Sequence, residues 1–321
     1  MSAQPEPALT ALEVRPFHRD DRDQLTDLIN AHVAAVVPGV SVSVNTVLSQ
    51  LQRQPDEFIV DPWVAERLTL VAGHRHGVVA AAHLLRYRTD AAVGECYRGA
   101  GGIEWFVCHP PASFRPGARE AADLLMSACL AQFVRWKVTS RYADGALPAP
   151  GVYGLPEPWP HIRAAYERAG FVHDGDTEIV LIADVADLPP RPAGPSDPAG
   201  LSVRRTLGEC GTRFTAHPPP TAGRDTRIAG FIEVDTVLDR AERRPRGGGL
   251  ADIGNLHVAE EYRDTGLTTW LLGHAAHWLR LAGSDRLLAY ASPDESDRIR
   301  ELTAHGFCEL TRTARGWHHR P

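Results

Sequence analysis

Paired cysteines, long apolar runs and lysine are what this sequence lacks or nearly lacks. No apolar stretch approaches the roughly 20 residues that cross a bilayer, and the N-terminal residues have neither the positive leader nor the apolar core of a secretory signal. The cysteines are odd in number and form no CxxC pair, which indicates reduced, buried thiols and no disulfide framework or metal site. We therefore expect a cytoplasmic protein without a membrane partner. The five cysteines are Cys96, Cys108, Cys129, Cys210 and Cys308.

The positive charge comes almost entirely from arginine, because Lys137 is the only lysine. The net charge is −6, and an acidic balance without a long basic face argues against nucleic acid as a partner. The densest basic stretch, residues 239–249, contains glycines and a proline that favour a solvated loop over a binding patch. A chain of 321 residues is long enough for two separate cores.

A proline- and glycine-rich segment divides the chain near residue 190. After it, "LSVRRTL" begins a strand much as "LEVRPFH" does near residue 12, which suggests an internal repeat. We predict an N-terminal domain over 1–187, a linker over 188–200 and a C-terminal domain over 201–321.

Hydrophobic periodicity predicts antiparallel strands first and a strand–helix–strand–helix–strand order at the end of each domain. This order predicts an α+β fold with a mixed sheet. In the first domain, Ser43 or Asn45 is the expected N-cap of the second helix. The expected strands there are 12–17, 67–75, 78–88, 101–110, one near 140–147 and 177–185, with helices at 19–37, 43–52, 119–138 and 159–171. The second domain repeats the order without the two early helices: strands 201–207, 212–217, 227–237, 250–258, 286–291 and 308–317, with helices at 265–282 and 295–307.

The stretch "LHVAEEYRDTGLTTWLL", residues 256–272, reads as a strand, a small-residue turn and the start of a helix. Free amides at such a helix start form a phosphate site. An ordinary turn, with Gly266 chosen for its backbone geometry, is the alternative.

The chain resembles the GNAT acetyltransferase superfamily, in tandem. The signature Arg/Gln-x-x-Gly-x-Gly/Ala, after a strand and before a helix with a leucine pair, matches Val258, Arg263, Gly266, Thr268 and Leu271-Leu272. A helix ending in Gly-Phe appears twice, as "AAYERAGF" and "LTAHGF". The resemblance implies two GNAT-like domains, each a mainly antiparallel sheet flanked by helices, the C-terminal one shorter. It also implies transfer of an acetyl group from acetyl-CoA to an amine of a small molecule or peptide, by a monomer or homodimer.

Acetyl-CoA would then lie along the strand and loop of the second domain. The loop amides would bind its pyrophosphate, and the strand edge would bind its pantetheine arm. The N–H of Val258 would donate a hydrogen bond to the thioester oxygen. Thr268 departs from the family's Gly or Ala, although its hydroxyl can bind phosphate. The implied cofactor residues are Leu256, His257, Val258, Arg263, Asp264, Thr265, Gly266, Leu267 and Thr268.

The corresponding turn of the first domain, "HPPASFRPGAREAADLL", has prolines that remove amide donors and places Arg119 and Ala121 where the family has small residues. We expect this domain to bind acetyl-CoA poorly or not at all. It keeps Tyr166 at the position of the family's proton-donating tyrosine, whereas the second domain has Leu302.

Three residues are candidate catalytic groups. Asp252, on the strand before the loop, matches the family's carboxylate base, or is only a solvent-facing residue. Tyr290 is a substitute acid or a packed core aromatic, and Tyr166 would serve an independent activity of the first domain. If His257 has no role in binding, it is only a residue of the sheet surface. The "HRH" stretch at 74–76 has the His-x-His spacing of metal ligands, but it has no third ligand nearby. The C-terminal "WHHRP" is expected to be a frayed tail. The rival to an enzyme is a non-catalytic acyl-CoA sensor or scaffold.

Overall fold

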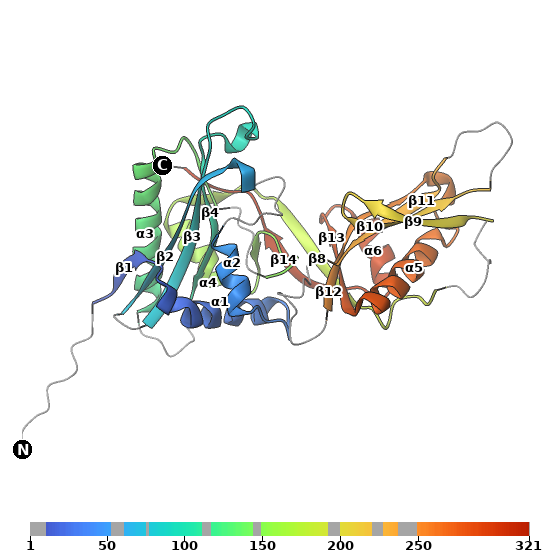
Figure 1. Ribbon diagram of the computed structural model, residues 1–321, viewed down its shortest axis with the longest axis horizontal. Helices are drawn as coiled ribbons and strands as arrows, with labels where there is room; N and C mark the ends of the chain where they lie inside the picture. The colour runs from blue at the N-terminus through green and yellow to red at the C-terminus, as the bar shows by residue number, and fades with distance from the viewer. Residues whose placement is uncertain are drawn as a thin grey trace, which may run out of the picture. The chain divides into compact units, whose positions relative to one another are not determined.

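Two units with separate cores make up the structure, a computed structural model that describes residues 11–52, 61–74, 77–110, 117–143, 149–191, 200–219, 227–236 and 249–320 (Figure 1). Unit 1 comprises residues 1–38, 42–176 and 313–321, and unit 2 comprises residues 39–41 and 177–312. The division therefore differs from the predicted one, because the chain enters unit 2 before residue 187 and its last residues belong to unit 1. Most of the predicted linker, residues 192–199, lies outside the described residues.

Unit 1 is built on a seven-stranded sheet in the order β1-β2-β3-β4-β5-β15-β7. Neighbouring strands are antiparallel except β4 and β5, which pair in parallel at Gly101↔Arg141 and Gly102↔Tyr142. The strands are β1 (Glu13–Pro16), β2 (Val64–His74), β3 (Gly77–Tyr87), β4 (Gly101–Cys108), β5 (Arg141–Tyr142), β7 (Phe171–His173) and β15 (Trp317–His319).

Two α-helices of unit 1 begin at local signals that the sequence contains. Ser43 caps α2 (Val44–Gln50), and its hydroxyl accepts a hydrogen bond from Thr46 N at 3.1 Å, as expected of an N-cap. Pro160 opens α4 (Pro160–Arg168), where its missing N–H costs nothing. The longer helices α1 (Arg22–Val36) and α3 (Ala118–Trp136) both pack on β3.

The C-terminal residues form the strand β15, and the prediction of a frayed tail is wrong. Trp317 is 1% exposed, its ring stacks on His173 with centroids 5.1 Å apart, and it meets Tyr166 edge-on at 5.7 Å. The strand pairs with β7 at Trp317↔His173 and with β5 at His318↔Tyr142. Burial of the indole and the ladder bonds outweigh the entropy that would fray a polar terminus.

Unit 2 is built on the strands β14-β8-β13-β12-β11-β10-β9, in that spatial order. The last two residues of β14, Thr313 and Ala314, fall in unit 1, where they pair with the short strand β6 (Leu155–Pro156). The strands are β8 (Thr177–Asp184), β9 (Ser202–Gly208), β10 (Gly211–His217), β11 (Gly230–Asp235), β12 (Gly249–Val258), β13 (Ser284–Ala291) and β14 (Cys308–Ala314).

Strand β8 is present where the sequence predicts a strand, but it belongs to the sheet of unit 2 and not to the first domain. It pairs antiparallel with β13 from Ile179↔Ala291 to Asp184↔Arg286. Its side chains Ile179, Leu181 and Ala183 are buried in the core of unit 2. Apolar alternation fixes which face of a strand is buried but not which sheet receives it, so the sequence pattern alone misassigned this strand.

Helix α5 (Leu267–Ala282) covers this sheet with an apolar stripe at helical spacing, and α6 (Ser296–Ala304) follows β13. The stripe includes Leu267, Leu271, Ala275 and Leu279, all 1% exposed or less. Antiparallel strands followed by strand–helix–strand–helix–strand confirm the predicted α+β class.

All five cysteines are free thiols, but only Cys108 and Cys129 are buried, whereas Cys96 and Cys308 are exposed. The expectation that most of them are buried is therefore only partly met. Among the described residues no helix is both long and apolar enough to span a bilayer.

Candidate functional site

An opening between β12 and β13 is the central feature of unit 2. The two strands pair in parallel only from Gly249↔Ser284 to Asp252↔Leu288. On its other side β12 stays paired with β11 up to Val258↔Gly230. The edge of β12 that faces β13 is therefore without strand pairing from residue 253 to 258, and its backbone groups can pair with an extended, amide-rich ligand.

Backbone direction identifies the groups that line this open edge. The N–H of Ala259 donates to Ala229 O at 2.8 Å, toward the β11 side. Because backbone groups of successive residues point to opposite sides of a strand, those of Val258 and Leu256 point to the open edge. His257 points its backbone to β11, and its exposed ring lies 5.7 Å from the ring of Phe231.

The open edge leads into the start of α5. Gly266 is the N-cap with φ +82°, no side chain caps the helix, and a Cβ at Gly266 would have no atom within 4 Å. The first-turn amides are therefore presented to open space beside the positive end of the helix dipole. Residues 263–266 are exposed, whereas Leu267 and Thr268 are 1% and 8% exposed.

A hydrogen-bonded acid pair lies where the two strands separate. Tyr290 Oη, on β13, donates to Asp252 Oδ2, on β12, at 3.0 Å. Burial raises the pKa of Asp252 to about 6, and the negative charge of Asp235 on β11 adds to this, while the bond from Tyr290 opposes it. Tyr290 packs among Val180, Leu288 and their neighbours with its hydroxyl on the carboxylate. A carboxyl group with this pKa can exchange protons near neutral pH.

Sequence reasoning missed a buried carboxylate on the neighbouring strand β11. Glu233, on β11, is fully buried and accepts hydrogen bonds from Arg213 Nε at 2.5 Å and Asn255 Nδ2 at 2.6 Å. The available signal was an acidic residue within the apolar run "FIEV", because a charge in such a strand requires partners.

Unit 1 contains a similar opening. Among the described residues, which omit 144–148 after β5, strand β4 pairs with β5 only at Gly101 and Gly102. His109 N donates to Val79 O at 3.1 Å, as Ala259 N donates to Ala229 O in unit 2. Cys108 therefore corresponds to Val258. Helix α3 also begins after a left-handed glycine, Gly117 with φ +84°.

This register corrects the predicted alignment of the first turn. Gly117, and not Arg119, stands at the position of Gly266, and Arg119 corresponds to Thr268. Apolar periodicity locates the first residue of a helix poorly, which explains why the predicted alignment was shifted by two residues. Residues 111–116 of the turn, with two of its prolines, lie outside the described residues.

Two histidines occupy the open edge of β4 in unit 1. His161 Nε2, on α4, lies 3.1 Å from Cys108 O and 3.1 Å from His32 Nε2. His32 Nδ1 lies 2.8 Å from Leu28 O, so its Nδ1 carries the proton and its Nε2 is an acceptor. The single Nε2–H of His161 is therefore shared between His32 Nε2 and Cys108 O. Burial lowers the pKa of His32 to about 4 and also lowers that of His161, so both rings are neutral at physiological pH.

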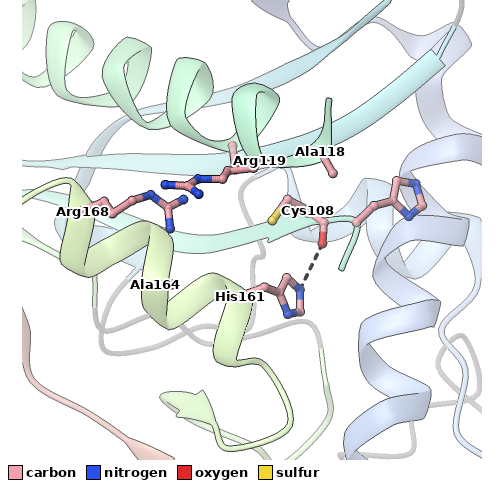
Figure 2. Close-up of a pocket in the computed structure, with 8 residues that line it drawn as sticks. Cys108, Ala118, Arg119, His161, Ala164 and Arg168 are labelled. Carbon is pink, nitrogen blue, oxygen red and sulfur yellow. Dashed lines mark hydrogen bonds between the residues drawn. The ribbon is translucent and has the colours of Figure 1, made fainter. Parts of the chain in front are cut away.

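Figure 2 shows the small cavity beside His161. It has a volume of about 260 Å³ and lies between the end of β4, the start of α3 and one face of α4. Arg119 and Arg168 lie at one end of it, and both approach Asp123, with Arg168 in contact at 2.6 Å. Its walls are Cys108, His109, Ala118, Arg119, Ala122, His161, Ala164 and Arg168.

Tyr166 lies inside the aromatic core of unit 1. It is 3% exposed and its ring contacts Phe106, Phe171 and Trp317. Such a packed side chain has the surroundings of a core aromatic. In the "HRH" stretch, His76 lies outside the described residues, and the described part of the chain brings no three potential metal ligands together.

Comparison with known proteins decides which family this arrangement represents. Residues 191–307 match the sequence model of the acetyltransferase (GNAT) family, and this range contains the open strand, the loop and the helix start. The chain therefore contains a GNAT acetyltransferase domain. The match identifies the GNAT acetyltransferase domain with unit 2 in particular. No curated protein sequence matched the chain.

Solved structures extend the GNAT likeness to nearly the whole chain. A tandem GNAT protein from the clavulanic acid biosynthesis pathway shares 16% identity with a TM-score of 0.58, over 96% of this chain and 98% of that one. A GCN5-related N-acetyltransferase from Sphaerobacter thermophilus shares 13% identity with a TM-score of 0.56, over 96% and 95%. A fungal glucosamine N-acetyltransferase region of a multi-domain β-N-acetylglucosaminidase shares 14% with a TM-score of 0.58. That match covers 98% of this chain, which spans 38% of the fungal one. At these identities the likeness shows a shared fold.

Proposed function

We propose that this GNAT protein transfers an acetyl group from acetyl-CoA to an amine at the opening between β12 and β13 of unit 2. One observation supports this most directly. The open edge of β12 connects the Asp252–Tyr290 pair at one end with the uncapped start of α5 at the other. A proton-transfer pair and an anion site joined by free backbone groups suit a thioester donor with a phosphate-bearing tail.

Acetyl-CoA supplies the activated acetyl group, and residues 256–268 are proposed to hold it. The amides around Gly266 are available to the pyrophosphate, since no capping side chain competes for them. Backbone groups of Leu256 and Val258 are available to the pantetheine arm, and the Val258 N–H to the thioester oxygen. Arg263, Asp264 and Thr265 form the exposed outer turn, where Asp264 has φ +63° and Thr265 Oγ1 donates to Tyr262 O at 2.6 Å.

Asp252 and Tyr290 are proposed to move the protons. Asp252 accepts the proton that the attacking amine must lose, and a pKa of about 6 lets the carboxylate do so at neutral pH. Tyr290 delivers its hydroxyl proton to the departing thiolate and recovers a proton from Asp252 through the 3.0 Å bond. The acceptor is an amine of a small molecule or peptide.

Unit 1 is proposed to bind no acetyl-CoA. The carbonyl of Cys108, equivalent to that of Val258, already accepts a bond from His161.

Calorimetry and turnover together test the proposed function. The full chain is titrated with acetyl-CoA, and a library of amines is then screened for acceptor-dependent release of free thiol. One donor site per chain with thiol release and acetylated amine supports the proposal. Acetyl-CoA binding without transfer to any amine favours the alternative, a non-catalytic acyl-CoA sensor of the same fold. One structural observation favours that alternative. Leu302 occupies the position of the family's tyrosine, and it is a buried core residue that cannot donate a proton.

A further inference from the structure

The buried carboxylate of Glu233 joins three segments of unit 2. Besides Arg213 and Asn255, it accepts bonds from the amides of Glu209 at 3.2 Å and Cys210 at 3.3 Å, in the turn between β9 and β10. Burial acts to raise the pKa of Glu233, but the bonds from Asn255 and Arg213 outweigh it and hold the pKa below its ordinary value. Glu233 is therefore ionised, and its charge is matched by charged and neutral donors.

Asn255 follows an irregularity in β12. Pairing with β11 runs through Asn255↔Glu233 and resumes at Ile253↔Val234, so Gly254 is the extra residue of a β-bulge. This bulge comes two residues after Asp252, where β12 loses its pairing with β13. The bulge thus marks the start of the open edge.

The β9–β10 turn packs directly on that bulge. A Cβ at Gly254 would overlap Cys210 Cβ, and a Cβ at Gly208 would overlap the carboxylate of Glu233. Asn255 Nδ2 also lies 3.6 Å from Cys210 Sγ. The close approach requires glycine at both positions.

We infer that the β9–β10 turn, residues 208–211, is a positioning element for the acyl donor: through Glu233 and Cys210 it fixes the bulge at Gly254 and with it the open edge of β12. This inference rests on the proposed function. Buried ion pairs contribute little net stability and can instead specify one geometry. Here the geometry specified is the strand edge proposed to hold the pantetheine arm.

Glu233→Gln provides the first test, with two ligands. A neutral Gln cannot balance the charge of Arg213, so the bulge should shift. A displacement of about 1 Å in a binding site can lower the reaction rate roughly 100-fold. We expect the Kd and KM for acetyl-CoA to rise about tenfold or more. The nucleotide fragment of CoA that keeps the pyrophosphate but lacks the pantetheine arm should bind the variant as it binds the wild type. Equal weakening of both ligands would indicate general loss of structure and overturn the inference.

Gly254→Ala provides a second test that does not disturb the buried charge. The added methyl group must displace Cys210, so acetyl-CoA should bind more weakly, and Cys210→Gly in the same chain should restore binding. Gly77→Ala, in unit 1, is the matched control, because a Cβ there meets no atom within 4 Å and this glycine, like Gly254, has no left-handed φ.

The outcomes separate this inference from the proposed function. A wild type that binds no acetyl-CoA removes the proposed function itself. A wild type that binds acetyl-CoA, with a folded Gly254→Ala variant of equal affinity, leaves the function intact and refutes the positioning role. The same holds if Cys210→Gly fails to restore the affinity of a folded variant.

Discussion

Replacing Asp252 by Asn separates the proposed base from its surroundings. Asn keeps the size of the side chain and an oxygen that accepts the 3.0 Å bond from Tyr290, but it has no charge and takes no proton. Help from a general base typically contributes about 10²–10⁴-fold, so kcat/KM for the amine should fall by that factor at neutral pH. The Kd for acetyl-CoA, measured by calorimetry, should stay unchanged.

The pH dependence of this variant gives a second readout. Burial raises the pKa of Asp252 from 3.8 to about 6, so the wild-type rate should rise through pH 6 and the Asn variant should lack that rise. Asp235→Asn is the matched control, because it removes the neighbouring charge that helps raise this pKa. It should move the rise to lower pH without abolishing it.

Stability should change in the opposite direction to activity. Since the folded pKa of Asp252 is the higher one, its contribution to stability is complete below pH 3.8 and is lost as the pH rises through about 6. The shift corresponds to about 3 kcal/mol, so the Asn variant should be more stable than wild type at neutral pH by up to that amount. Chemical unfolding at several pH values measures the difference.

An Asp252→Asn variant with wild-type rates at every pH would remove Asp252 from the mechanism.

Four further outcomes are expected. Gly266→Asp should abolish acetyl-CoA binding, because the carboxylate would face the pyrophosphate, while Gly283→Asp, at the other left-handed end of α5, should lose about 1–2 kcal/mol of stability and keep its affinity. Tyr290→Phe should lower kcat more than it raises KM, and an acyl donor with a more acidic thiol should reduce that loss. Trp317→Ala should destabilise unit 1 by about 3–5 kcal/mol in denaturant unfolding, against almost no change for Leu207→Ala, since Leu207 is 90% exposed. Calorimetry should give one acetyl-CoA per chain, and two equivalent sites would contradict the reading of unit 1.

Local physics made much of the fold predictable from sequence. Helix periodicity and caps depend on neighbours within a few residues. The cap Ser43 of α2 is therefore one of the two residues that the sequence offered, and α5 begins within two residues of its predicted start at residue 265. The strand before that helix, the loop and the α+β class follow from the same short-range patterns. Asp252 and Tyr290 were both singled out, although nothing in the sequence indicated that they contact each other.

Only the tertiary structure decided which distant segments meet. Strands β8 and β15 have ordinary strand patterns, yet their partners are chosen by burial of residues such as Leu181 and Trp317 in cores made by remote parts of the chain. The same holds for the bond between Tyr290 and Asp252, 38 residues apart, and for the charge of Glu233. A sequence pattern states which faces must be buried, whereas the partner that buries them is selected by the free energy of the whole packed structure.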